Sequence, residues 1–185
     1  MFILGNDCTG ARIYQAKDKE YDNPFMWCLI PPKSFSFLYK NFTNIKFENV
    51  EVKKDGEWYK IVIDKNVDVY YPHYRFDGNV KTPTVGKSGI DVYYYKIEEY
   101  IIEKYTSRLK RMTGSPLFII NDTKTPLVNG KCTYNKDDLT EYVNKGDCFV
   151  LTSDKTIKGK NVIYKPEGKV SSMAAAKIII EKTNI

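Results

Sequence analysis

Histidine is nearly absent from this 185-residue chain, which contains one, and tryptophan occurs only twice. The four cysteines, Cys8, Cys28, Cys132 and Cys148, form no Cys-x-x-Cys pair, so we expect free thiols and no zinc cluster. No apolar run approaches about 18 residues, which predicts no membrane span. The apolar start Met1–Leu4 is too short for a secretory signal. We therefore expect a cytoplasmic protein with reduced cysteines and no metal.

The excess of positive charge is moderate, with a net charge of +6. The lysines are spread along the chain without a run of five, so a nucleic-acid partner is not expected. The contents of hydrophobic residues (42%) and charged residues (28%) are typical of a soluble globular protein and exclude intrinsic disorder. The length corresponds to about one domain, so we predict a single α/β domain over residues 1–185.

Apolar runs alternate with helical patterns along the chain. Short apolar runs predict buried strands at 1–5, 117–121, 148–152 and 162–165, and helical spacing predicts helices at 11–16, 34–42, 90–112, 137–144 and 171–182. Asp55-Gly56 lies between two alternating segments in 50–64 and predicts a hairpin. Residues 67–74 predict a further strand, and 77–89 a loop. This order is typical of a three-layer α/β sandwich with a mostly parallel sheet and an antiparallel hairpin insertion.

Cys8 is the first candidate for chemistry, because it follows the first strand and begins the first helix. Open α/β sheets bind ligands at the carboxyl ends of their strands. A helix N-terminus lowers the pKa of a thiol placed there, and the thiolate is the nucleophile. A buried cysteine that merely fills space is the alternative. Gly10 would let a substrate approach the backbone closely.

His73 is the one imidazole that could serve Cys8 as a base. Its orienting partner could be Asp68, Asp77, Asp91 or a backbone carbonyl, and the sequence does not choose among them. A lone histidine is also frequently structural.

Asn6 and Asp7 flank the candidate nucleophile and could act as an oxyanion donor and an orienting carboxylate. Capping of the first helix is their alternative role. Arg108 and Arg111 lie three positions apart and share one face of the predicted long helix. They could bind a phosphate or carboxylate, with Arg108 nearer the cleft and Arg111 nearer solvent, or they could form a solvated face.

Several segments resemble an uncharacterised bacterial family associated with exopolysaccharide biosynthesis. Asn6–Gly10, with Tyr14 following, resembles the family opening S-N-N-C-x-G-G-x-x-Y, although Thr9 and Ala11 depart from it. Tyr21–Phe25 resembles its Y-x-S-P segment, His73-Tyr74 its His-Tyr pair, and Glu99–Met112 its helix with R-x-x-R. Pro24-Phe25-Met26-Trp27 resembles the P-F-D-W segment of putative papain-like cysteine peptidases, with Met26 in place of Asp.

The resemblance implies a Cys–His site in a protein of surface-polysaccharide biosynthesis. We expect a cysteine-dependent acyltransferase that uses Cys8 as nucleophile and His73 as base on a small-molecule or glycan substrate. Gly10, Tyr14, Tyr74, Arg108 and Arg111 would contact the substrate. No permanently bound cofactor is expected, and a coenzyme A thioester would be the acyl donor. The alternatives are a papain-like peptidase or amidase, or a non-catalytic protein that binds a glycan or nucleotide.

Overall fold

The computed structural model describes residues 1–56, 58–71, 84–85, 91–92, 97–123, 134–183 and 185. In chain order its elements are β1 (Phe2–Gly5), α1 (Thr9–Ala16), α2 (Pro32–Asn41), the 3-10 helix η1 (Phe42–Asn44), β2 (Glu51–Asp55), β3 (Trp58–Asp64), β4 (Val67–Tyr71), β5 (Thr84–Val85), β6 (Asp91–Val92), α3 (Ile97–Leu109), β7 (Pro116–Asn121), α4 (Lys136–Lys145), β8 (Cys148–Thr152), β9 (Val162–Tyr164) and α5 (Ser172–Thr183).

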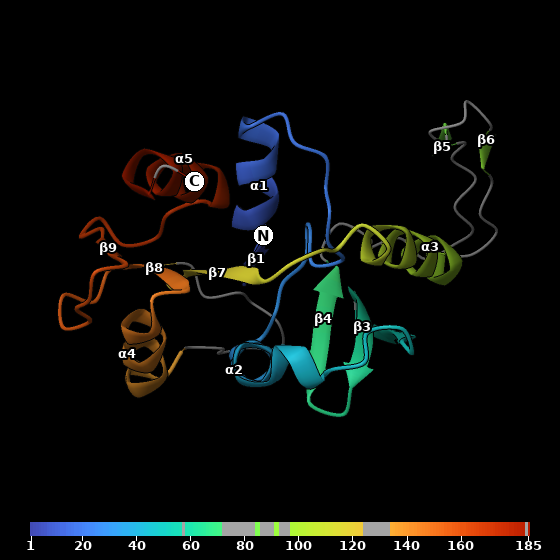
Figure 1. Cartoon of the computed structure of the whole chain (residues 1–185), viewed down its shortest axis with the longest axis horizontal. Coiled ribbons are helices and arrows are strands. Elements are labelled where there is room, and N and C mark those ends of the chain that lie inside the picture. Colours follow the sequence, from blue (N-terminus) through green and yellow to red (C-terminus); the bar gives the residue numbers. More distant parts are fainter. Residues whose placement is uncertain (57, 72–83, 86–90, 93–96, 124–133, 184) are drawn as a thin grey trace.

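A parallel sheet with helices on both faces forms one half of the molecule. Its strand order is β1-β7-β8-β9, and each neighbouring pair is parallel. Helices α1 and α5 cover one face, and α2 and α4 cover the other (Figure 1). Successive side chains of a strand point to opposite faces of the sheet. Ile3 and Ile119 accordingly pack in the core beside α1 and α5, whereas Leu4 and Phe118 belong to the larger core on the other face. The predicted three-layer α/β arrangement is confirmed.

An antiparallel sheet in the order β2-β3-β4 forms the other half. The predicted hairpin at Asp55-Gly56 is confirmed, and β4 extends it to a separate three-stranded sheet. The segment Leu29–Ile30 connects the two sheets. Leu29 and Tyr70 exchange backbone hydrogen bonds of 2.7 and 2.8 Å, and the Ile30 N–H donates to the Asn6 carbonyl at 2.9 Å. The larger core is continuous from the parallel sheet into the antiparallel one.

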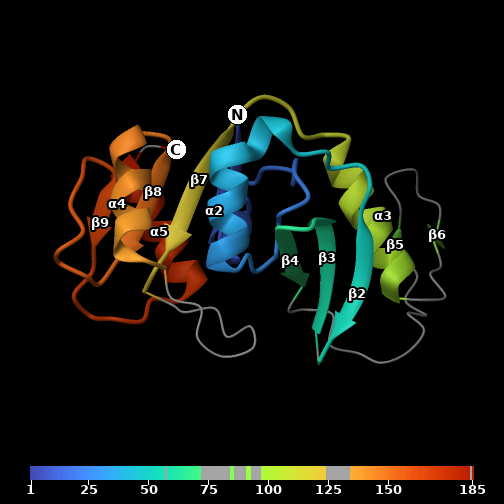
Figure 2. The same ribbon diagram turned by 90° about the horizontal axis from the view of Figure 1, so that it is seen from below.

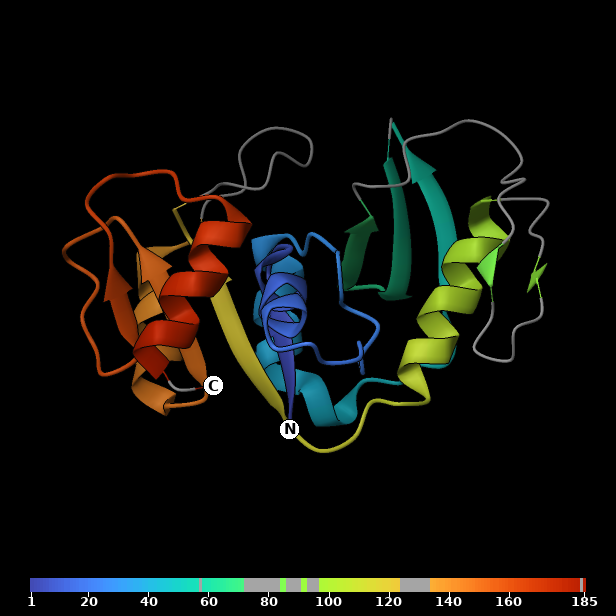
Figure 3. The same ribbon diagram turned by 90° about the horizontal axis from the view of Figure 1, so that it is seen from above.

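The carboxyl ends of β1 and β4 point to the same side of the molecule. β1 runs parallel to β7, and the arrows of β7 and β4 run in the same general direction in Figures 2 and 3. Residues that directly follow β1 and residues at the end of β4 therefore lie toward one edge.

The longest helix starts later than the sequence pattern predicts. α3 begins at Ile97 and ends at Leu109, and Asp91–Val92 of the predicted helix instead form strand β6 with β5. Valine is a strand former, and the tyrosines that follow Val92 have the same preference, so a helix was the wrong prediction there. Thr84–Val85, predicted as loop, form β5, and the rest of 77–89 lies outside the described residues.

The helix ends follow the local signals in the sequence. Pro32 occupies the first turn of α2. Asn135 accepts a hydrogen bond from Asp137 N–H at the start of α4, and Gly146 ends that helix with a φ of 84°. Ser171 Oγ accepts from Ala174 N–H at 3.3 Å before α5. No helix in the described part of the chain combines the length and apolar character needed to cross a bilayer.

Candidate active site

Cys8 lies in the turn that leads from β1 into α1, and it is the N-cap residue of α1. Its side chain is half-buried, whereas Thr9–Ala11 are buried. β1 is the edge strand of the parallel sheet, beside β7, and the Ile30 N–H donates to the carbonyl of Asn6, directly after β1. Cys8 thus follows the carboxyl end of a parallel strand, the edge at which open α/β sheets bind ligands. The position predicted for Cys8 is confirmed, and its catalytic role stays a prediction.

Two glycines and a tyrosine hold α1 against β1. A Cβ atom on Gly5 would lie 2.9 Å from the Gly10 nitrogen, so the turn closes only with glycine at this crossing. Tyr14 is buried, and its hydroxyl donates to Asp22 at 2.6 Å and accepts from Ile3 N–H at 3.3 Å. Burial, together with the bond to Asp22, raises the pKa of Tyr14. Gly10 and Tyr14 therefore have structural roles, and their contact with a substrate stays a prediction.

Asn6 and Asp7 are fixed by Asn121, which ends β7. Asn6 Oδ1 accepts from Asn121 N–H at 2.8 Å, and Asn6 Nδ2 donates to the Asn121 carbonyl at 3.4 Å. Asn121 Nδ2 donates to Asp7 Oδ2 at 3.3 Å and to the Val170 carbonyl at 3.2 Å. Asp7 Oδ1 accepts from Thr9 N–H at 2.8 Å and so caps α1. The predicted capping hydrogen bond is therefore made by Asp7, one residue before the N-cap Cys8, whereas Asn6 joins β1 to β7.

A second row of polar side chains continues this edge toward β8. Thr152 Oγ1 donates to Asp122 Oδ2 at 2.8 Å, and Thr123 Oγ1 donates to Asn121 Oδ1 at 2.6 Å. Burial raises the pKa of Asp122, the Thr152 bond opposes this increase, and the charge of Asp154 adds to it. The ends of β7 and β8 thus carry two groups of hydrogen-bonded polar side chains, one around Asn121 and one around Asp122.

Cys28 is a buried neighbour of Cys8. The Cys28 thiol donates to the carbonyls of Met26 and Pro24 at 3.4 and 3.6 Å, and Tyr71 Oη donates to the Pro24 carbonyl at 2.9 Å. Burial raises the pKa of Cys28 to about 12; Tyr71 opposes this increase, and the nearby Cys8 adds to it. Cys8 and Tyr71, the last residue of β4, therefore both lie close enough to Cys28 to shift the pKa of its thiol.

The described cysteines differ in exposure. Cys28 and Cys148 are fully buried, and burial raises the pKa of Cys148 as well. Cys8 is the one described thiol that is half-exposed. Cys132 lies outside the described residues. Only a thiol that solvent and substrate can reach serves as a nucleophile, which favours Cys8 over Cys28 and Cys148.

His73 and Tyr74 lie outside the described residues, so their predicted roles stay predictions. Tyr71, the last residue of β4, precedes His73 by two positions in the sequence. Tyr71 also contacts Cys28, which is the buried neighbour of Cys8. Tyr71, two positions before His73 in the sequence, therefore lies near the surroundings of Cys8.

The three carboxylates that could orient His73 lie in different parts of the chain. Asp68 lies within β4 and pairs with Lys60 at 3.0 Å. Asp91 belongs to β6, and Asp77 lies outside the described residues. The third member of the predicted Cys–His site stays open.

Arg108 lies in the last turn of α3, whereas Arg111 lies two residues after its end, so the predicted helix to residue 112 is too long; both arginines attach this region to the segment that precedes Cys28. Arg108 Nη1 donates to the Met26 carbonyl at 3.0 Å, and its guanidinium lies 5.4 Å from the Tyr21 ring centroid. Arg111 Nε and Nη2 donate to the Tyr21 carbonyl at 3.1 and 2.8 Å, and Arg111 pairs with Glu20 at 3.6 Å. Both arginines thus have structural partners, and their binding of a substrate anion stays a prediction.

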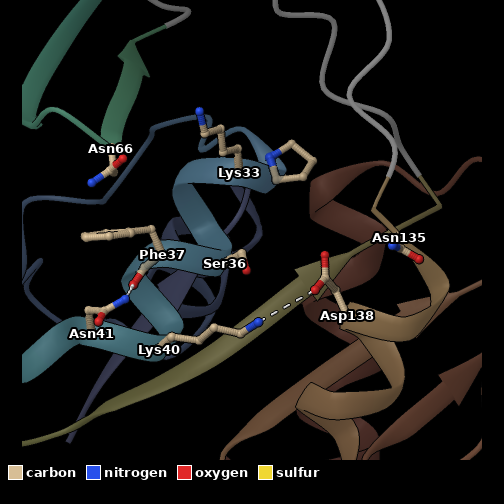
Figure 4. A pocket seen from close by; sticks show the side chains of 9 residues that line it. Lys33, Ser36, Phe37, Lys40, Asn41, Asn66, Asn135 and Asp138 are labelled. Carbon is tan, nitrogen blue, oxygen red and sulfur yellow. Dashed lines mark hydrogen bonds and ion pairs between the residues drawn. The ribbon is translucent and has the colours of Figure 1, made fainter.

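A shallow depression of about 430 Å³ lies on the outer face of α2, in the layer opposite α1 (Figure 4). Lys40 extends toward Asp138, and its Nζ lies 3.8 Å from Asp138 Oδ1. Its lining residues are Pro32, Lys33, Ser36, Phe37, Lys40, Asn41, Asn66, Asn135 and Asp138. It contains none of the candidate site residues. Within the described ranges, no cluster of three His, Cys, Asp or Glu side chains could hold a metal ion.

The sequence analysis missed the polar residues at the ends of the neighbouring strands. Asn121-Asp122 directly follow an apolar run, and Thr152 ends another. The carboxyl ends of parallel strands meet at one edge, so this position alone could have indicated that these side chains lie at the edge where Asn121 contacts Asp7.

The sequence was also compared with known proteins. The family model of a domain of unknown function, DUF1919, matches residues 1–184. The chain belongs to the DUF1919 family. The match to DUF1919 covers both sheets and places Cys8 within the family domain. No curated protein matches the chain. The resemblances to exopolysaccharide proteins and to papain-like peptidases stay predictions.

Proposed function

We propose that this DUF1919 protein is a cysteine-dependent acyltransferase that acts on a sugar or glycan precursor in surface-polysaccharide biosynthesis. One observation supports the nucleophile most directly: the half-exposed Cys8 thiol lies at the start of α1, just after the carboxyl end of the parallel strand β1. The partial positive charge of the helix N-terminus favours the thiolate, and the first-turn N–H groups after Thr9, whose own N–H is bonded to Asp7, are suited to a developing oxyanion.

His73 is the proposed base, because it follows Tyr71 by two positions and Tyr71 lies near the surroundings of Cys8. In the first step His73 takes the Cys8 proton, and the sulfur attacks the carbonyl carbon of an acyl-coenzyme A. The bond from that carbon to the coenzyme A sulfur breaks, and the imidazolium returns the proton to the released thiolate. The products are acyl-Cys8 and free coenzyme A.

In the second step His73 takes the proton of an acceptor hydroxyl group. The hydroxyl oxygen attacks the Cys8 thioester, and the carbon–sulfur bond breaks. The released Cys8 thiolate recovers the proton from the imidazolium, so the enzyme returns to its starting state. The acceptor leaves as an ester.

Mass spectrometry after incubation with acetyl-coenzyme A tests the proposal. We expect one acetyl group on the peptide that contains Cys8, none in Cys8→Ala, and an unchanged adduct in the control Cys132→Ser. His73→Ala should form the adduct about 100-fold more slowly, since a general base contributes at least that much.

Two results would reject acyl transfer. If acetyl-coenzyme A leaves Cys8 unmodified and a peptidyl chloromethylketone labels it, the protein is a peptidase or amidase. If neither reagent modifies Cys8 and iodoacetamide alkylates it no faster than a free thiol, the protein is a non-catalytic binding protein.

A further inference from the structure

The outer face of α1 carries, beside Cys8, a charged side chain that could bind a ligand. Within α1 and its cap, Cys8 and Arg12 are half-buried and Gln15 is exposed, whereas Thr9–Ala11 and Ile13 are buried. Residues four apart lie on one face of a helix with their Cβ atoms about 6 Å apart. Arg12 is therefore the cationic side chain one turn away from the Cys8 thiol.

The Arg12 guanidinium is held in place by its neighbours. It stacks on the indole ring of Trp27, 4.7 Å from the ring centroid, and its Nη1 donates to Gln15 Oε1 at 2.7 Å. The Arg12 Nε is buried, and none of the described residues accepts a hydrogen bond from it. No carboxylate among the described residues forms an ion pair with Arg12, in contrast to Arg111, which pairs with Glu20.

Trp27 adopts an unusual backbone conformation at this position. Its φ of 64° lies in the left-handed region, which a bulky side chain rarely adopts. The indole also packs edge-on against Tyr21 at 6.1 Å. Strained residues of this kind persist only where the surroundings hold them, and they gather at ligand sites.

We propose that Arg12, stacked on Trp27, binds an anionic group of the substrate whose acyl carbon reacts with Cys8. The ligand chemistry is a phosphate or a carboxylate one helical turn from the reacting carbonyl. The proposal rests on the proposed function in taking Cys8 as the reacting group.

A stacked guanidinium suits this task for physical reasons. The face of the group is covered by the indole, so its N–H donors point outward in one plane and match the oxygens of an oxyanion. The Nη groups of Arg12 are the donors that a bound anion would reach, because no carboxylate among the described residues pairs with them. Arg108 and Arg111, by comparison, already donate to backbone carbonyls.

Alkylation of Cys8 by iodoacetate and iodoacetamide tests the proposal. The two reagents share a leaving group, and only iodoacetate is an anion. We expect the iodoacetate-to-iodoacetamide rate ratio at Cys8 to fall about three- to tenfold in Arg12→Gln, because a unit positive charge one helical turn away is lost. Arg12→Lys should give an intermediate ratio. Lys17→Gln, which removes an exposed charge beyond the far end of α1, should leave the ratio unchanged.

Equal rate ratios in the parent protein and Arg12→Gln would overturn the proposal. Thermal melts of each variant check that the fold is retained, and the ratio compares two reagents on one protein, so a change in stability cancels. The expected difference should shrink as sodium chloride is added.

Inorganic phosphate and acetate, compared at equal ionic strength as competitors of iodoacetate, distinguish the two ligand sources. Slower alkylation of the parent protein with phosphate, lost in Arg12→Gln, assigns a phosphate group, and the same result with acetate assigns a carboxylate. Protection by neither anion would overturn the proposal.

The alkylation ratio and the acetyl-coenzyme A experiment fail independently. A reduced ratio in Arg12→Gln without an acetyl adduct on the parent protein supports the anion subsite and rejects acyl transfer. An acetyl adduct with an unchanged ratio rejects the subsite alone.

Discussion

The parallel and antiparallel sheets differ in where their polar side chains lie. β1 is buried throughout, and Asn6, Asn121 and Thr152 at the ends of the parallel strands are fully buried and hydrogen-bonded. β3 alternates between buried and half-buried residues, and its polar partners pair near the surface, as Lys60 does with Asp68 at 3.0 Å. A sheet covered on both faces leaves polar groups only at its strand ends, which concentrates chemistry at that edge.

The comparison predicts that reactivity depends on the parallel edge and that both sheets contribute stability. Ile61→Ala in β3 removes a fully buried side chain from the core and should cost about 2–5 kcal/mol of unfolding free energy. Asn121→Ala should cost about 2–4 kcal/mol, because Asp7 and Val170 lose a buried donor.

Only Asn121→Ala should also slow the alkylation of Cys8, since Asn121 holds Asp7 beside it. Urea unfolding gives the stabilities, and residue-resolved mass spectrometry gives the rates. An equal loss of Cys8 reactivity in folded Ile61→Ala would remove the distinction between the two sheets.

Two glycines sharpen the comparison, because they are required for different reasons. Gly5→Ala should cost about 2–3 kcal/mol, because the new Cβ would lie 2.9 Å from the Gly10 nitrogen and 3.1 Å from the Asp7 carbonyl. Gly56→Ala meets no atom within 4 Å, but its φ of 63° should cost about 1 kcal/mol.

Asparagine tolerates the left-handed conformation, so Gly56→Asn should recover part of the stability, whereas Gly5→Asn should not. Thermal melts of the four variants measure this. Recovery by asparagine at Gly5 would show that crowding is not the constraint there.

Arg108→Ala tests whether the arginine in the last turn of α3 is structural. The variant loses a charged hydrogen bond to the half-enclosed Met26 carbonyl and the contact with the Tyr21 ring, so unfolding free energy should fall by about 1.5–3 kcal/mol. Denaturant unfolding measures the loss, with Lys110→Ala, an exposed residue directly after α3, as the control. Unchanged stability in Arg108→Ala would favour the predicted anion-binding role instead.

The smallest effect is expected at Lys60, on the antiparallel sheet. Lys60→Met should cost about 0.5–1 kcal/mol, because the pairs with Asp68 and Asp55 lie near the surface. Burial acts to lower the pKa of Lys60, but the bond and charge of Asp68 raise it overall.

A raised lysine pKa stabilises the folded state fully below the ordinary lysine value and ceases to do so as pH rises through the folded value. The stability difference between parent and Lys60→Met should therefore be constant from pH 7 to about 9 and shrink above about 10.4. Urea titrations across this range measure it, and a difference that grows with pH would contradict the assignment.

Local sequence signals predicted where helices, strands and turns lie, but they did not predict the contacts between these elements. The apolar run at 148–152 is strand β8, Asp55-Gly56 is the hairpin turn, and Gly146 ends α4, because each depends on neighbouring residues alone. Helical spacing placed Arg108 and Arg111 on one face but could not show that the carbonyls of Met26 and Tyr21 face them.

The site was predicted only in part for the same reason. The position of Cys8 follows from one strand and one helix. The support from Asn121 depends on which strand lies beside β1, and Trp27 contacts Arg12 through a segment that crosses between the sheets. Neither pairing leaves a periodic pattern in the sequence.

The rate of Cys8 alkylation tests the central claim most directly. Limiting iodoacetamide at pH 7, followed by residue-resolved mass spectrometry, compares Cys8 with Cys28, Cys148 and free glutathione. We predict that Cys8 reacts about tenfold or more faster than glutathione, because it lies at a helix N-terminus, and that the buried Cys28 and Cys148 stay unmodified in the folded protein. A Cys8 rate equal to that of glutathione, or as slow as that of Cys28, would contradict the assignment of Cys8 as the nucleophile.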